Sequence, residues 1–261
     1  MRGRSTLFDL TGKVAIVTGS TRGIGEAIAH RMAEHGARVV VSSRKAEACD
    51  RVALEVNTRW GEGEEIAIPV PCNIAHKDQL QALVERTRAH WGRIDVLVCN
   101  AAVNPYFGPS RDLPDEAFDR IMGSNVRSNH WLCHLVLPEM VERRDGVIVI
   151  VSSIGGLRGS PILGAYCISK AADMQLARNL AVEYGAQNVR VNCIAPGLVQ
   201  TSFARALWES PEILERTTAT TPLRRIGQPD EIAGAAVFLA APAGAFITGQ
   251  TLVIDGGVTI V

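Results

Sequence analysis

The chain has 261 residues, of which 47% are hydrophobic and 21% charged, a composition typical of a globular protein with a large core. Lysine and arginine balance aspartate and glutamate at 27 each, and neither charge type gathers in a block. The balance argues against nucleic acid or an anionic membrane surface as a partner.

Targeting signals are not predicted. No apolar run reaches the ~18–20 residues needed to cross a bilayer. Residues 1–9 are positively charged but have no apolar segment behind them, so they do not form a secretory signal. The six cysteines include no Cys-x-x-Cys pair, which indicates reduced thiols and a cytoplasmic protein.

Strand-like and helix-like segments alternate along the whole chain. We predict strands at 14–18, 38–42, 65–69, 96–99, 147–151, 190–194 and 251–254, and helices at 25–35, 45–58, 77–90, 114–142, 166–184 and 230–240. This alternation predicts an α/β fold with one Rossmann-type, doubly wound parallel sheet of about seven strands and helices on both faces. We expect a single domain over residues 1–261.

A glycine-rich turn lies between the first predicted strand and the first predicted helix. Such a turn lets a pyrophosphate approach the N–H groups at a helix start, so it indicates a dinucleotide site. The spacing is Gly-x-x-x-Gly-x-Gly rather than Gly-x-Gly-x-x-Gly, and the strand–helix context supports the assignment. The turn comprises Gly19, Ser20, Thr21, Arg22, Gly23, Ile24 and Gly25.

The second predicted strand is not followed by a carboxylate. Ser43 and Arg44 stand where an acidic residue would bind a ribose 2′-hydroxyl, and they favour a 2′-phosphate instead. Arg22 offers a second cation. These residues favour NADP(H) over NAD(H), although Arg44 would also suit a solvated helix start, so NAD(H) stays open.

Three polar residues follow the apolar run at 146–151. Ser153 comes just after this predicted strand, and Tyr166 and Lys170 lie four residues apart on the next helix. An ammonium about 4 Å from a phenol, at an effective dielectric of roughly 20, would favour the phenolate by about 4 kcal/mol. The pair therefore predicts a tyrosine pKa that is lowered by at most about 3 units, from about 10 to about 7. A pKa in this range suits proton transfer. Tyr-x-x-x-Lys alone is also common in ordinary helices.

We predict no metal site. His130 and His134 have helical spacing with Cys133 between them, but the sequence offers no third ligand nearby and no His-Glu-x-x-His motif.

Further motifs follow in order along the chain. The set comprises the glycine-rich turn, Asn100-Ala101-Ala102, Asn125, Ser153, Tyr166-x-x-x-Lys170 and Pro196-Gly197. In this combination the chain resembles the short-chain dehydrogenase/reductase family from about residue 10 to residue 257. Within the family, it looks most like the NADP(H)-dependent carbonyl (retinal-type) reductase branch.

The resemblance implies a role for each catalytic residue. Tyr166 would be the general acid in carbonyl reduction, or the base in alcohol oxidation. Lys170 would lower its pKa and hold the nicotinamide ribose. Ser153 would position the substrate oxygen, and Asn125 would hold a water in a relay to Lys170.

The resemblance also extends the cofactor site beyond the turn and Ser43–Arg44. Asn73 stands where the family commonly has Asp, and Asn100-Ala101-Ala102 replaces the commoner Asn-Ala-Gly; neither change touches the catalytic set. The further cofactor residues are Asn73, Ile74, Asn100, Ala101, Tyr166, Lys170, Pro196, Gly197, Val199 and Thr201.

Residues 198–222 would form a lid over the substrate, or else an ordinary surface segment. Leu163 and Trp208, with Ser153 and Tyr166, are the expected substrate contacts. The candidate pocket walls carry few charges, which favours a small apolar carbonyl or alcohol.

Two alternatives stay open. One is an NAD-dependent secondary-alcohol dehydrogenase or 3-oxoacyl-type reductase on the same fold, and the other is a non-catalytic dinucleotide sensor. The resemblance further implies a homotetramer built on helices near 114–142 and 166–184 and on the C-terminal strand.

Overall fold

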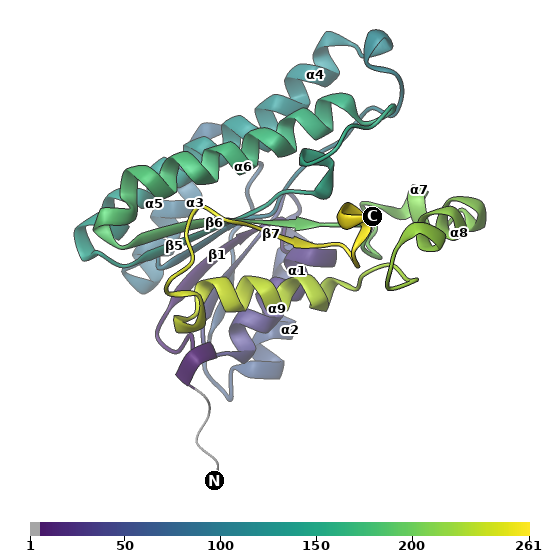
Figure 1. The fold of residues 1–261 in the computed structure, drawn as a ribbon. Coiled ribbons are helices and arrows are strands. Elements are labelled where there is room, and N and C mark those ends of the chain that lie inside the picture. The colour runs from purple at the N-terminus through teal and green to yellow at the C-terminus, as the bar shows by residue number, and fades with distance from the viewer. Residues whose placement is uncertain (1–5) are drawn as a thin grey trace.

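A computed structural model describes residues 6–261 (Figure 1), so the expectation about an N-terminal signal falls largely outside the described residues. Seven parallel strands form one sheet, as predicted, and their order is β3-β2-β1-β4-β5-β6-β7. The strands are β1 (Val14–Thr18), β2 (Arg38–Ser42), β3 (Ala67–Pro69), β4 (Val96–Cys99), β5 (Gly146–Val151), β6 (Val189–Pro196) and β7 (Thr251–Ile254).

Helices cover both faces of the sheet, which explains why the central strands are apolar on both sides. One core packs α1 (Gly23–Glu34), α2 (Ala46–Trp60) and α9 (Pro229–Ala240) against the sheet. A second core lies on the other face, beneath α3 (Lys77–Trp91), α5 (Ser128–Arg143) and α6 (Gly164–Tyr184). The doubly wound architecture is therefore confirmed.

Three strands differ in length from the sequence-based prediction, and β5 differs only because it begins at Gly146 instead of residue 147. β3 begins at Ala67 rather than at residue 65, because the Asn57 side chain accepts from the backbone N–H groups of Ile66 and Ala67. β6 continues to Pro196, where it pairs with Ile254 of β7, instead of ending at residue 194. Its extra length carries the chain to the edge at which the strands end.

The helix expected over 114–142 is interrupted. α4 (Asp115–Met122) leads into a π-helical turn at Gly123–Arg127, and only then does α5 begin. The N–H of Ser128 donates to the carbonyl of Gly123, a bond that spans five residues instead of four. π-turns inside α-helices are rare and frequently mark functional sites, and this one contains Asn125.

The remaining elements are short. Residues 198–222 include α7 (Arg205–Trp208) and α8 (Pro211–Thr220), which lie at one end of the sheet in Figure 1. Single 3₁₀ turns occur at Thr6–Phe8, Ser110–Asp112, Ile154–Gly156, Gly185–Gln187, Pro242–Gly244 and Val258–Ile260. Within residues 6–261, no helix combines the length and apolar character needed to cross a membrane.

Candidate active site

A cleft of about 1070 Å³ opens at the carboxyl ends of the strands. Its walls come from the β1–α1 turn, the ends of β2, β4, β5 and β6, the start of α6 and residues in the 198–217 segment. Ligands of open α/β sheets bind at this edge. The glycine-rich turn, Ser43–Arg44 and Ser153 were each predicted to follow a strand, and all of them line this cleft.

The glycine-rich turn has the shape of an anion cradle. Gly19 and Gly23 have φ of +66° and +59°, in the left-handed region that favours glycine. A Cβ on Gly25 would come within 2.4 Å of both the Gly19 carbonyl oxygen and the Asn100 amide nitrogen. The Arg22 side chain makes no capping hydrogen bond to α1, so the first N–H groups of that helix stay available to a phosphate.

Asn100 holds this turn in place from the end of β4. Its Nδ2 donates to the carbonyl oxygens of Thr18 and Gly19 at 2.9 and 3.2 Å. The N–H groups of Asn100 and Ala101 both donate to Thr18 Oγ1. Asn100 therefore joins the cofactor turn to the central sheet, as the family resemblance implies.

Ser20 departs from its expected place in the cofactor site. Its side chain is buried, donates to the Val17 carbonyl at 2.7 Å and accepts from the Ser42 N–H at 2.8 Å. The hydroxyl thus joins β1 to β2 beneath the turn and does not line the cleft. The other predicted cofactor residues do line it: Gly19, Thr21, Arg22, Gly23, Ile24, Gly25, Ser43, Arg44, Asn73, Ile74, Asn100, Ala101, Tyr166, Lys170, Pro196, Gly197, Val199 and Thr201.

Positive charge gathers beside the end of β2. Arg22, Arg44 and Lys45 all line the cleft there, together with Ser43. Among the described residues that line the cleft, none is an aspartate or a glutamate. The electrostatics of this end suit a phosphate better than a bare ribose hydroxyl.

The catalytic candidates meet on the opposite side of the cleft. Ser153 Oγ is placed to stabilise the Tyr166 phenolate, which lowers the pKa of Tyr166. The same Oγ accepts from the Gly155 N–H at 3.1 Å, which leaves the serine O–H as a donor. Lys170 Nζ lies 5.8 Å from the centroid of the Tyr166 ring.

The structure corrects the expected direction of the Tyr166 pKa. Burial raises this pKa above its ordinary value of 10.0, and it outweighs Lys170 and Ser153, which both lower it. Asp173 adds to the increase, because a second negative charge opposes the phenolate. The sequence-based expectation counted the lysine alone, whereas its Nζ is paired with the buried Asp173 carboxylate at 3.1 Å.

Asn125 is fully buried inside the π-turn. Its side chain accepts from the Val103 N–H at 2.8 Å and donates to the Val103 carbonyl and to Ser169 Oγ. Its own backbone carbonyl accepts from the amide of Asn129 at 2.7 Å. Asn129 in turn donates to Asp173, so protein side chains connect Asn125 to Lys170.

Three of the four predicted substrate contacts, Ser153, Tyr166 and Leu163, line the cleft, and Trp208 does not. The Trp208 indole is turned aside and donates to the Thr201 carbonyl at 2.8 Å. From the same segment, Phe203 lines the cleft instead, with its ring centroid 6.2 Å from that of Tyr166. Arg120 and Arg158 also line the cleft, so its walls are more positively charged than the sequence suggested.

Known proteins resemble this chain in both sequence and fold. A family model described as enoyl-(acyl carrier protein) reductase matches residues 19–259. Dehydrogenase/reductase SDR family member 4 of Bos taurus is 47% identical over 248 residues, which cover 95% of this chain and 88% of the relative. The chain belongs to the short-chain dehydrogenase/reductase family.

Solved structures of this family superimpose closely. A 7α-hydroxysteroid dehydrogenase, complexed with NADH and 7-oxo glycochenodeoxycholic acid, has a TM-score of 0.92 at 38% identity and covers 97% of both chains. A gluconate 5-dehydrogenase from Burkholderia cenocepacia, in complex with NADP and tartrate, has a TM-score of 0.92 at 31% identity, covering 98% of both chains. The chain is thus an oxidoreductase of the short-chain dehydrogenase/reductase type, and the non-catalytic alternative gains no support.

Sequence reasoning missed two groups of residues. Asp173 and Asn129 were detectable, because they lie three residues after Lys170 and four after Asn125, on the same helix faces. Arg120, Arg158, Ile213 and Thr217 line the cleft without any motif around them. Their positions depend on how separate loops and helices converge, which no local pattern shows.

Proposed function

We propose that this enzyme is an NADP(H)-dependent carbonyl reductase in which Tyr166 is the general acid. One observation carries the proposal: Ser153, Tyr166 and Lys170 face the same cleft whose other end presents Arg22, Arg44 and Lys45. The first group suits proton transfer to a carbonyl oxygen, and the second suits a 2′-phosphate.

The chain's own residues would divide the work as follows. The nicotinamide cofactor, when bound, supplies the hydride that reduces the carbonyl carbon. The Tyr166 hydroxyl donates its proton to the carbonyl oxygen, which completes the alcohol. The Ser153 hydroxyl orients that oxygen, and the Lys170 ammonium stabilises the phenolate that remains. In the reverse direction, Tyr166 accepts the proton.

The cofactor assignment is supported by the fit of the cleft. The crowded Gly25 position and the uncapped start of α1 would hold a pyrophosphate, while Ser43 and Arg44 would hold the 2′-phosphate. Asn73 would face the adenine, although its side-chain oxygen also accepts from the Ala75 N–H at 3.2 Å. NAD(H) remains the alternative that the cofactor experiment must reject.

The first test follows nicotinamide absorbance at 340 nm with aldehydes, ketones and α-dicarbonyls. We expect NADPH to be oxidised faster than NADH, and Tyr166→Phe to lose about 10²–10⁴-fold of the rate. Arg44→Ala should raise the KM for NADPH about tenfold or more, because a hydrogen bond to a charged group contributes about 1.5–3 kcal/mol. Arg86→Ala, an exposed arginine on α3, is the matched control.

A preference for NADH, unaffected by Arg44→Ala, would reject the 2′-phosphate assignment and leave the catalytic tyrosine standing. Full activity of Tyr166→Phe would reject the mechanism itself.

Arg120 and Arg158, on the substrate side of the cleft, support a second candidate substrate class, which is carbonyl compounds that carry a carboxylate. Arg158 and Arg120 line the cleft along with Leu163 and Phe203, so an apolar body and an anionic end could be held together. Arg158→Gln should then raise the KM for a keto acid severalfold and leave an uncharged ketone unaffected. Equal effects on both substrates would return the assignment to small apolar carbonyls.

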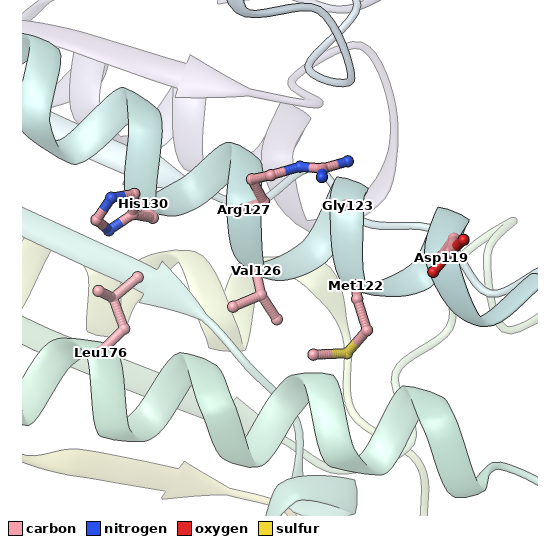
Figure 2. A pocket seen from close by; sticks show the side chains of 7 residues that line it. All are labelled: Asp119, Met122, Gly123, Val126, Arg127, His130 and Leu176. Carbon is pink, nitrogen blue, oxygen red and sulfur yellow. The ribbon is translucent and has the colours of Figure 1, made fainter.

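We also propose a homotetramer. Figure 2 shows Met122 and Val126 pointing toward α6 while Leu176 points back from it, around a hollow of about 590 Å³. Phe118 and Ile168 are exposed on α4 and α6, the helices that carry Met122 and Leu176. Elsewhere, Val182, Phe246, Leu252 and Ile260 expose further apolar surface, and β7 is an edge strand. Exposed apolar surface of this extent supports burial against further copies.

Light scattering in solution tests the assembly. We expect the mass of four chains, and a smaller species for Leu176→Asp. Leu54→Asp, an exposed leucine on α2, is the control and should leave the mass unchanged. A monomeric wild type would reject the proposal.

A cytoplasmic location completes the proposal. All six cysteines are free thiols and five of them are buried, which suits a reducing compartment. Fractionation of the host cell with marker enzymes tests it, and recovery in an oxidising compartment would reject it.

A further inference from the structure

The ammonium of Lys170 has a buried counter-ion. Nζ donates to Asp173 Oδ2 at 3.1 Å and to the Val151 carbonyl at 2.9 Å. The side chains of Lys170 and Asp173 are only 2% and 0% exposed. Two of the three ammonium hydrogens are thus used inside the protein, and the third remains for a ligand in the cleft.

Asn129 fixes the other side of the carboxylate. Its Nδ2 donates to Asp173 Oδ1 at 2.9 Å and to the Asn125 carbonyl at 2.7 Å. Because both partners are acceptors, the amide orientation is determined. Each Asp173 oxygen therefore accepts from a donor, an arrangement that suits an ionised carboxylate and not a protonated acid.

The groups around this pair are otherwise uncharged. Cys99 of β4, Cys133 of α5 and Cys193 of β6 are buried thiols. A hydrogen bond with Cys133, and then burial, raise the pKa of Cys99, and burial raises the pKa of Cys193. Cys193 Sγ donates to the Asp173 backbone carbonyl at 3.5 Å. From β5 the Val151 carbonyl accepts from Lys170 Nζ, and from the π-turn the Asn125 backbone carbonyl accepts from Asn129; neither group carries a charge. Asp173 is thus the charge that balances Lys170.

We propose that Asp173, held by Asn129, is a positioning residue that balances the Lys170 charge and keeps Tyr166 in its protonated form. The inference rests on the proposed role of Tyr166 as the general acid. Reduction uses the phenol, whereas oxidation uses the phenolate. Asp173 thereby extends carbonyl reduction to higher pH and confines alcohol oxidation to more alkaline conditions.

The direct test measures the ionisation of Tyr166 itself. The chain has three tyrosines, so Tyr106→Phe with Tyr184→Phe leaves Tyr166 as the only one. Tyrosinate absorbance is titrated in this background with and without Asp173→Asn, which replaces the carboxylate by an amide of the same shape. We expect the midpoint to fall by about one pH unit, because an unbalanced ammonium favours the phenolate.

Activity provides a second readout. In Asp173→Asn, the pH limbs of both oxidation and reduction should move to lower pH by the same amount. Asp95→Asn removes another buried carboxylate, at the opposite edge of the sheet, and should move neither limb. A purely structural role of Asp173 would lower rates without moving the limbs.

If Asp173→Asn does not fold, Asn129→Asp with Asp173→Asn keeps the net charge and the hydrogen bond between positions 129 and 173, gives up the bond to the Asn125 carbonyl, and moves the charge away from Lys170. A midpoint below that of the wild type supports the inference. An unchanged or raised midpoint, in whichever variant folds, overturns it. The tyrosinate titration needs no substrate, so failure of the proposed reductase activity is seen separately as an absence of turnover.

Discussion

Two aspartates, Asp95 and Asp173, are buried at opposite ends of the strands, and their surroundings differ. Asp95 precedes β4 and accepts from the Val14 N–H and from Arg93, with Lys13 and Arg143 within 4.0 Å. Asp173 lies behind the carboxyl ends of the strands, with one ammonium and one amide as its partners.

The difference shows how a buried charge can serve stability or chemistry. Asp95 is surrounded by several cations and also joins backbone segments, since its own N–H and carbonyl bond to Val14 and Val147. Among residues 6–261, Asp173 pairs with a single cation, Lys170, and that cation also acts on Tyr166. A carboxylate with many partners stabilises the fold. A carboxylate that shares its cation with a tyrosine changes the pKa of that tyrosine.

The largest expected effect comes from removing the Asp95 carboxylate. Asp95→Ala should lower the free energy of unfolding by about 3–5 kcal/mol, because the cations around it lose their partner. Urea unfolding measures the loss. The pH limbs of the remaining activity should stay in place. A loss below about 1 kcal/mol would mean that Asp95 is not the structural member of the pair.

A smaller effect is expected at the second partner of Asp173. Asn129→Ala leaves Oδ1 of the carboxylate without its donor, and an unsatisfied buried polar group costs about 1–3 kcal/mol. Urea unfolding again gives the value. Asn179→Ala, which removes an exposed bond to Gln175 on α6, is the matched control and should change little. Equal losses in the two variants would contradict the buried network.

The smallest expected loss of stability comes from removing an exposed carboxylate, that of Glu231. Hydrogen bonds from Arg225 and from the Gln228 N–H lower the pKa of Glu231 from 4.5 to about 2. Since the folded pKa is depressed, this contribution is present above pH 4.5 and is lost as the pH falls toward 2. Glu231→Gln should therefore cost about 1 kcal/mol or less at pH 7 and nothing near pH 2.

Thermal unfolding of the wild type and of Glu231→Gln, measured between pH 2 and pH 7, tests this prediction. A difference that persists at pH 2 would show that Glu231 acts through packing instead of charge.

The sequence predicted well those features that are encoded locally. Apolar runs located all seven strands, and the glycine-rich turn and the Tyr166–Lys170 spacing located both ends of the cleft. It failed where a side chain had two possible directions. Ser20 turns inward to Ser42, and Trp208 turns to the Thr201 carbonyl, because backbone groups compete for them.

The Tyr166 pKa could not be predicted for a different reason. It is a balance of burial, Ser153, Lys170 and Asp173, and only the positions of Lys170 and Asp173 follow from spacing on one helix. Burial depends on the assembled cleft, and the effect of Asp173 depends on which way a long lysine side chain extends. Phe203, from a distant segment, also packs near the ring.

The π-turn at Gly123–Arg127 has a consequence for how this chain tolerates changes in length. The turn holds one residue more than an α-helical turn, so its conversion to a regular α-helix without loss of a residue would rotate every later residue of α5 by about 100° relative to α4. Asn129 would then face away from Asp173. Deletion of one residue from the turn would instead leave α5 close to its present orientation, so the alignment of the Lys170 counter-ion tolerates a shorter chain here better than a regular helix of the same length.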